Sequence, residues 1–148
     1  MSSPAQIPLL ERFKTCYGDF NAESVRLLAP LYAKQVRFTD PLHSLVGWPE
    51  VERYFLASAH NLLHCKFEFI DEVVSSQAAF YKWRMHYAHR KIAGGAPQQL
   101  TGGSLIQFDT HITVHEDFYD LGALVYEQVP LLKSVIKLLK KRLAQEAH

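Results

Sequence analysis

The length, composition and charge of the chain exclude several classes of protein. Its 148 residues are typical of one domain that can bury a core without disulfides or metal ions. A hydrophobic content of 48% argues against disorder, and a formal net charge of +1 argues against a strongly basic nucleic-acid-binding protein.

Three helices are predicted in the first half of the chain. The first covers residues 7–17, where apolar residues recur at helical spacing. Asn21 is a candidate N-cap for the second, which Pro30 interrupts. The third begins near Pro49, and its apolar face continues to Leu62.

Between the second and third helices, residues 36–39 alternate as in a strand, and Pro41 ends this strand because it has no amide hydrogen to donate. Asp40 is therefore expected at a strand end, near a sheet edge or the rim of a pocket. Such a carboxylate could act as an acid or base, or could simply form the turn before the proline. His43 could relay protons or lie in an exposed loop.

The second half of the chain predicts an antiparallel meander, because the apolar period changes to two after Leu63. Four strands are expected, over residues 65–74, 79–87, 100–108 and 112–119. Gly102 and Gly103 lie inside the third of these strands, which indicates a bulge or a place where another group approaches the backbone closely.

Helices followed by strands predict an α+β fold. We expect a strongly curved antiparallel sheet with the N-terminal helices packed on its concave face, a cone-shaped roll with an apolar pocket at its open end. Residues 1–148 would form one domain, with residues 121–148 as a helical C-terminal extension.

Four segments follow one another as the landmarks of a known family do: LYAKQVRFTDP, LVGWPEVERYF, YKWRMHY and LTGGSLIQFDTHITVHEDFYD. Through them the chain resembles the SnoaL-like branch of the nuclear transport factor 2-like superfamily. The resemblance implies the cone-shaped fold and a homodimer through the convex sheet face. It does not fix a reaction, because the superfamily includes polyketide cyclases, ketosteroid isomerases, dehydratases, epoxide hydrolases and members that only bind ligands or partners.

The resemblance also points to site residues. Asp40 stands where ketosteroid isomerases carry the Asp that abstracts the proton. Phe13 and Ser104 fall where those enzymes carry the oxyanion donors, so steroid isomerisation is not expected here. In SnoaL-like cyclases the acid–base Asp lies on the late strands, which points to Asp117 and Asp120, although Asp120 could instead cap the following helix.

Aromatic residues are expected to line the pocket or to fill the core. Trp83 and Tyr81 share one strand face, and their polar atoms need partners when buried. The predicted ligand-binding residues are Phe13, Tyr54, Phe55, Tyr81, Trp83, Ser104 and Tyr119.

No metal site and no organic cofactor are predicted. His60 and His64 are four residues apart but lack a following carboxylate, and His111 and His115 would be about 13 Å apart along a strand. No glycine-rich phosphate loop is present.

The tail from Pro130 predicts a basic amphipathic helix, with its apolar residues on an arc of roughly 160° and four lysines opposite. This face is expected to pack on the sheet, to close the cone or to meet a second subunit. The alternative is an anionic membrane surface.

Two functions are compatible with these features. The first is a cofactor-independent isomerase or cyclase that transfers a proton on a small apolar or amphipathic carbonyl compound, with Asp40 as base and His43 or Asp117 assisting. The second is a non-catalytic ligand sensor or interaction dimer. Two cysteines, no transmembrane run and no secretory signal predict a cytoplasmic location.

Overall fold

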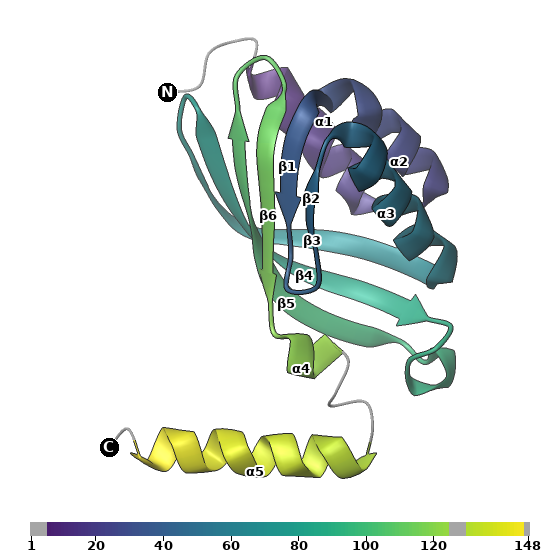
Figure 1. Ribbon diagram of the computed structural model, residues 1–148, viewed down its shortest axis with the longest axis vertical. Coiled ribbons are helices and arrows are strands. Elements are labelled where there is room, and N and C mark those ends of the chain that lie inside the picture. Colours follow the sequence, from purple (N-terminus) through teal and green to yellow (C-terminus); the bar gives the residue numbers. More distant parts are fainter. Residues whose placement is uncertain (1–5, 125–129, 147–148) are drawn as a thin grey trace.

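The structure is a computed structural model that describes residues 6–124 and 130–146 (Figure 1). The helices are α1 (Gln6–Gly18), α2 (Ala22–Leu28), η1 (Ala29–Leu31), α3 (Trp48–Asn61), η2 (Ala93–Gly95), α4 (Leu121–Leu124) and α5 (Pro130–Glu146). The strands are β1 (Tyr32–Thr39), β2 (Ser44–Val46), β3 (Leu62–Val74), β4 (Ala78–His89), β5 (Gln98–Phe108) and β6 (Ile112–Tyr119).

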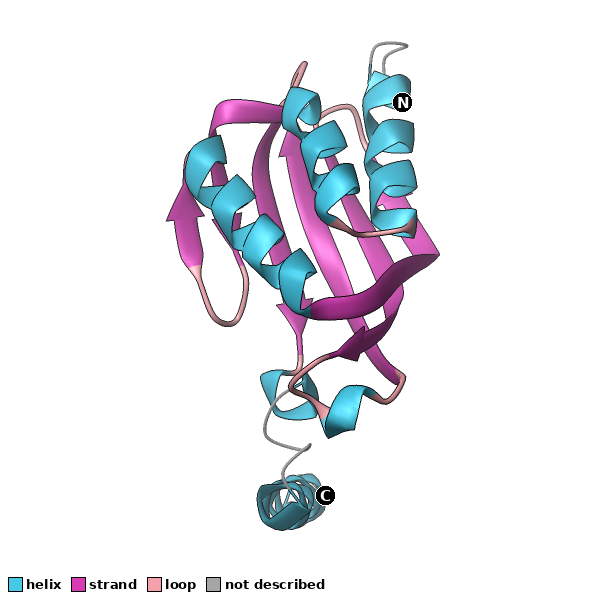
Figure 2. Ribbon diagram, turned by 90° about the vertical axis from the view of Figure 1, so that its right-hand side faces the viewer, coloured by secondary structure: helices cyan, strands magenta, loops and turns pink. Residues whose placement is uncertain are grey.

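Six strands of the described residues form one curved, unclosed sheet in the order β2-β1-β6-β5-β4-β3. All neighbours are antiparallel except β1 and β6, which are parallel. The helices α1, α2 and α3 cover one face of this sheet (Figures 1 and 2). The predicted α+β fold, with N-terminal helices on the concave face, is confirmed.

The first strand differs from its prediction. β1 begins at Tyr32 rather than at Val36, and its partner β2 was not predicted at all. A strand of three residues carries no period of its own, and its pairing of Phe38 with Leu45 depends on the turn between them.

The start of α2 follows from its sequence. The Asn21 side chain accepts the N–H of Ser24 at 2.9 Å, and the Ser24 hydroxyl accepts the N–H of Asn21 at 2.9 Å. This reciprocal pair is a capping box, so the predicted N-cap is confirmed. Pro30 lies in the short helix η1 that ends the segment.

Two adjacent glycines let aromatic rings of β4 lie against β5 on both faces of the sheet. A Cβ atom on Gly102 would lie 2.5 Å from the Phe118 carbonyl oxygen and 2.5 Å from the Trp83 ring. One on Gly103 would lie 2.5 Å from the Phe80 ring. The predicted close approach to the backbone is therefore confirmed, and the register of β4 and β5 runs through it without a shift.

We expect Gly102→Ala to lower the free energy of unfolding by about 1–3 kcal/mol, because a rigid Cβ would push Trp83 or the β6 backbone aside. Gly18→Ala is the matched control, since nothing lies within 4 Å of a Cβ at that position. Urea unfolding of both variants measures the difference. Equal stabilities would show that the sheet absorbs the extra methyl group.

Candidate functional site

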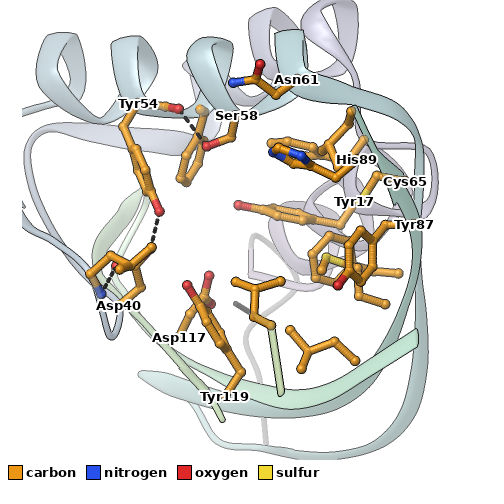
Figure 3. Close-up of a pocket in the computed structure, with 18 of the residues that line it drawn as sticks. Tyr17, Asp40, Tyr54, Ser58, Asn61, Cys65, Tyr87, His89, Asp117 and Tyr119 are labelled. Carbon is orange, nitrogen blue, oxygen red and sulfur yellow. Dashed lines mark hydrogen bonds between the residues drawn. The ribbon is translucent and has the colours of Figure 1, made fainter. Parts of the chain in front are cut away.

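A cavity of about 580 Å³ lies between α3, the concave face of the sheet and the turn from β1 to β2 (Figure 3). Most of its lining is apolar, including Phe20, Phe38, Phe55, Phe67, Trp83 and Leu100. Its polar groups include two carboxylates and four tyrosine side chains, those of Asp40, Asp117, Tyr17, Tyr54, Tyr87 and Tyr119. An apolar hollow with a few converging polar groups is typical of small-molecule sites.

Asp40 is both a turn residue and a cavity residue. Its Oδ1 accepts the N–H groups of Leu42 and His43 at 2.8 and 2.7 Å, which fixes the turn after β1. The Asp40 N–H in turn donates to the His43 carbonyl at 2.9 Å. Only 3% of the Asp40 side chain is exposed, and it borders the cavity.

Tyr54 on α3 forms a hydrogen bond with the second carboxylate oxygen of Asp40. Its hydroxyl donates to Asp40 Oδ2 at 2.5 Å, and the dashed line in Figure 3 marks this bond. Burial, and then the neighbouring Asp40 carboxylate, raise the pKa of Tyr54 well above its ordinary value. The phenol therefore stays protonated near neutral pH and remains a donor.

His43 packs against this pair without lining the cavity. Its ring centroid lies 4.3 Å from that of Tyr54, and its Nδ1 lies 3.8 Å from Asp40 Oδ1. The His43 side chain is 43% exposed. At this distance the His43 ring is not hydrogen-bonded to the Asp40 carboxylate.

Asp117 on β6 is held by a second set of donors. His115, two residues earlier on the same strand face, places Nε2 2.7 Å from Asp117 Oδ1. The Ser104 hydroxyl donates to the same oxygen at 2.5 Å, and Trp83 Nε1 donates to the Ser104 hydroxyl at 2.9 Å. Ser104 therefore lies behind Asp117 and does not line the cavity.

A buried chain of hydrogen bonds continues from His115 into the core. The Tyr32 hydroxyl lies 2.8 Å from His115 Nδ1, and the Tyr17 hydroxyl lies 3.1 Å from that of Tyr32. Burial raises the pKa of Tyr17 and of Tyr32 well above the ordinary value, so both stay protonated. We assign the Nε2–H tautomer to His115, because each hydroxyl then donates in turn toward Asp117.

Tyr119 completes the polar wall of the cavity. Figure 3 shows its hydroxyl beside the Asp117 carboxylate, on the side of the cavity that also holds Asp40. Burial, followed by the charges of Asp40 and Asp117, raises the pKa of Tyr119. This phenol is thus a protonated donor that faces an apolar space.

Other predicted residues lie elsewhere. Tyr81 and Phe13 are buried in the core, with ring centroids 5.8 Å apart, and neither lines the cavity. The sheet curves, so α1 covers the part of β4 that carries Tyr81, while Trp83 farther along reaches the cavity. Phe55 lines the cavity as well as packing in the core.

Asp120 also lies outside the cavity lining. Its Oδ1 accepts the N–H of Gly122 at 2.9 Å, and its Oδ2 accepts from Lys140 at 2.5 Å. The Lys140 ammonium holds the pKa of Asp120 below its ordinary value. This is the helix-capping alternative that the sequence left open for Asp120.

The sequence did not single out His115, Tyr32 and Tyr17 as a group. The spacing of His115 and Asp117 on one strand face was a usable signal, but Tyr32 lies before the residues at which the first strand was predicted. Among the described residues, no group of three His, Cys, Asp or Glu side chains is placed to hold a metal ion.

Removing the Tyr32 hydroxyl should be costly, because it would leave His115 Nδ1 and the Tyr17 hydroxyl without this partner. We expect Tyr32→Phe to lower the free energy of unfolding by about 1–3 kcal/mol. Tyr81→Phe is the matched control, because the buried Tyr81 hydroxyl has no hydrogen-bond partner among the described residues. Chemical denaturation should show the control unchanged or more stable; similar losses in both would contradict the hydrogen-bonded chain.

Comparison with known proteins identifies the family. The family model of the SnoaL-like domain matches residues 13–115. TsrD from Streptomyces laurentii is 18% identical, with a TM-score of 0.69 over 88% of this chain and 98% of that chain. A proposed SnoaL-like polyketide cyclase from Jannaschia sp. CCS1 is 11% identical, with a TM-score of 0.74 over 88% and 97%.

An NTF2-like protein of unknown function from Burkholderia pseudomallei K96243 is 13% identical, with a TM-score of 0.68 over 79% of this chain and 94% of that chain. No curated protein matches the chain. At these identities the structural likeness shows the fold alone. Together with the family match, it confirms the predicted family.

Proposed function

We propose that this chain, which belongs to the SnoaL-like domain family, binds a small apolar or amphipathic carbonyl compound in the cavity and catalyses proton transfer on it. The reaction class is that of a cofactor-independent isomerase or cyclase. The observation that carries the proposal is a pair of carboxylates, Asp40 and Asp117, that border one apolar cavity in different hydrogen-bonding environments.

These environments favour Asp117 over Asp40 as the acid–base group. Asp40 has both oxygens engaged, by two N–H groups and the Tyr54 hydroxyl. The described hydrogen bonds of Asp117 all fall on Oδ1, and its side chain is 18% exposed. We therefore revise the sequence-based choice of Asp40 as base: its proposed role is to fix Tyr54 and the turn.

In the proposed reaction, Asp117 Oδ2 removes a proton from a carbon next to the substrate carbonyl. The electron pair of that C–H bond forms the enolate, and the Tyr119 hydroxyl donates a hydrogen bond to the developing oxyanion. The protonated Asp117 then returns its proton to another carbon, which completes an isomerisation. In a cyclase, the enolate carbon would instead attack a second carbonyl of the same molecule, whose oxygen takes the proton.

His115 is a positioning residue in this proposal. It is 1% exposed and reaches the substrate only through Asp117, to which it donates from Nε2. The Tyr32 hydroxyl donates to His115 Nδ1, which keeps the proton of the ring on Nε2. Asp117 Oδ1 then accepts from His115, and Asp117 Oδ2 is the oxygen proposed to react.

Deuterium exchange tests the proposal without knowledge of the natural substrate. The protein is incubated in D₂O with 2-tetralone, a bicyclic ketone with acidic α-hydrogens, and loss of the proton signal is followed by NMR. We expect Asp117→Asn to slow the exchange by at least about 100-fold, because it removes the base and keeps the shape. Glu116→Gln is the matched control, on the same strand but outside the cavity lining.

The outcomes separate the two candidate functions. Exchange that survives in Asp117→Asn but fails in Asp40→Asn would return the role of base to Asp40. Binding of ketones in the cavity with no exchange above the solvent rate would replace the enzyme with the ligand-sensing alternative.

We also propose a homodimer through the convex sheet face. Phe80 and Phe118 are exposed there and flank Gly103, which lies under the Phe80 ring. Two exposed aromatic side chains on the convex face of the sheet are suited to pack against a second copy.

Phe118→Ser should convert the dimer to a monomer, as measured by light scattering after size-exclusion chromatography. Leu27→Ser, at an exposed apolar residue of α2, is the control and should leave the mass unchanged. A wild-type protein that is monomeric at tens of micromolar would overturn the dimer.

A further inference from the structure

The C-terminal helix α5 stands apart from the rest of the described protein, residues 6–124, which we call the body (Figures 1 and 2). Lys140 reaches back to Asp120, and Ile136 lies beside Gly122, where a Cβ atom would be 3.8 Å from its side chain. The apolar side chains farther round the helix are 45–66% exposed: Val135, Leu138, Leu139 and Leu143. The expected packing of this face on the sheet is thus not seen for these four residues.

The contacts with the body use only one flank of α5. At 100° per residue, Ile136 and Lys140 lie about 40° apart on the wheel, and the four exposed apolar residues fill an arc of about 140° that begins beside Ile136. Lys137 and Lys141 lie roughly opposite that arc. The helix therefore has one flank against the body, one apolar face toward solvent and one basic face.

Charge is distributed very unevenly between α5 and the rest of the chain. Five of the 16 basic residues and one of the 15 acidic residues lie in α5, which carries a formal charge of +4. The rest of the chain carries a formal charge of −3, which brings the whole to +1. The partner that suits α5 is therefore apolar and anionic at once, as is the surface of an acidic phospholipid bilayer.

A second copy of α5 is a poorer partner than such a surface. Two helices of charge +4 would repel each other, and Arg142 projects from the middle of the apolar arc, so a dry helix pair would bury its guanidinium. At a bilayer interface the Arg142 stem can lie among acyl chains while its head reaches the phosphates. No helix of the described residues is long and apolar enough to cross a membrane.

We propose that α5 lies in the plane of an anionic membrane surface and docks the protein there. Docking through α5 would also hold the cavity close to the bilayer, because Ile92 and Leu124 line the cavity from the η2 loop and α4. The η2 loop and α4 lie at the end of the body nearest α5 (Figures 1 and 2). If the proposed function holds, the ligand is then a lipid-phase molecule that enters the cavity from the membrane.

Co-sedimentation of the full chain with vesicles tests the docking. We expect binding to vesicles of phosphatidylcholine with 30% phosphatidylglycerol, and at least tenfold weaker binding for Lys137→Glu/Lys141→Glu and for Leu139→Glu. Arg26→Glu/Lys34→Glu and Leu27→Glu are the matched controls, since these residues are exposed on α2 and β1. They should bind as the wild type does.

Three outcomes would overturn the docking: no binding to anionic vesicles, equal binding to vesicles of phosphatidylcholine alone, or equal binding by the α5 variants and their controls. If the α5 variants bind vesicles normally but lose mass in light scattering, the face belongs to a second copy instead. Circular dichroism of each variant verifies that the body remains folded.

Transfer of a pyrene-labelled fatty acid from the same vesicles tests the delivery of ligand. Transfer to the wild type that falls at least tenfold in Leu139→Glu supports entry from the membrane. If the probe enters Leu139→Glu as fast as the wild type, delivery through α5 is overturned, while the proposed chemistry stands on the deuterium exchange. If the protein docks but takes up no probe, the lipid-phase ligand is overturned and the docking stands.

Discussion

The contact of the Trp83 ring with the bare backbone of Gly102 links the fold to the candidate site. Because Gly102 has no side chain, the ring can lie against β5, and its Nε1 then reaches the Ser104 hydroxyl at 2.9 Å. The Ser104 hydroxyl in turn donates a hydrogen bond to Asp117 Oδ1 and so helps to orient this carboxylate. A glycine in a strand interior usually weakens a strand, but here it lets a large core residue orient a carboxylate.

The two carboxylates of the cavity have different hydrogen-bond donors because they belong to different structural elements. Asp40 follows a strand and precedes a proline, so its neighbours' N–H groups converge on it locally. Asp117 lies inside a strand, where its own backbone is engaged in the sheet, and its donors come from distant side chains. Hydrogen bonds from neighbouring backbone groups favour a structural role for Asp40. In the proposed function, the buried side chains that hold Asp117 leave its second oxygen available for chemistry.

The body and α5 divide two tasks between them. The body buries an aromatic-rich core around the cavity, and α5 carries apolar surface that the body does not cover. In the proposed docking, the positive charge of α5 would attract this uncovered apolar surface to an anionic bilayer. Ile92 and Leu124 line the cavity from the η2 loop and α4, which lie at the end of the body nearest α5, so the two proposed roles can act together (Figure 1).

The sequence by itself, through residues near one another in the chain, determined most of the helices and strands of this protein. The periodicities that place α1, α3 and the four long strands, and the Asn21 cap, all concern neighbours in the chain. Tertiary structure alone decided the parallel pairing of β1 with β6, the burial of Tyr81 away from the cavity and the chain from Tyr17 through Tyr32 to His115. These features join residues up to 83 positions apart, and sheet curvature rather than side-chain period sets which of them meet.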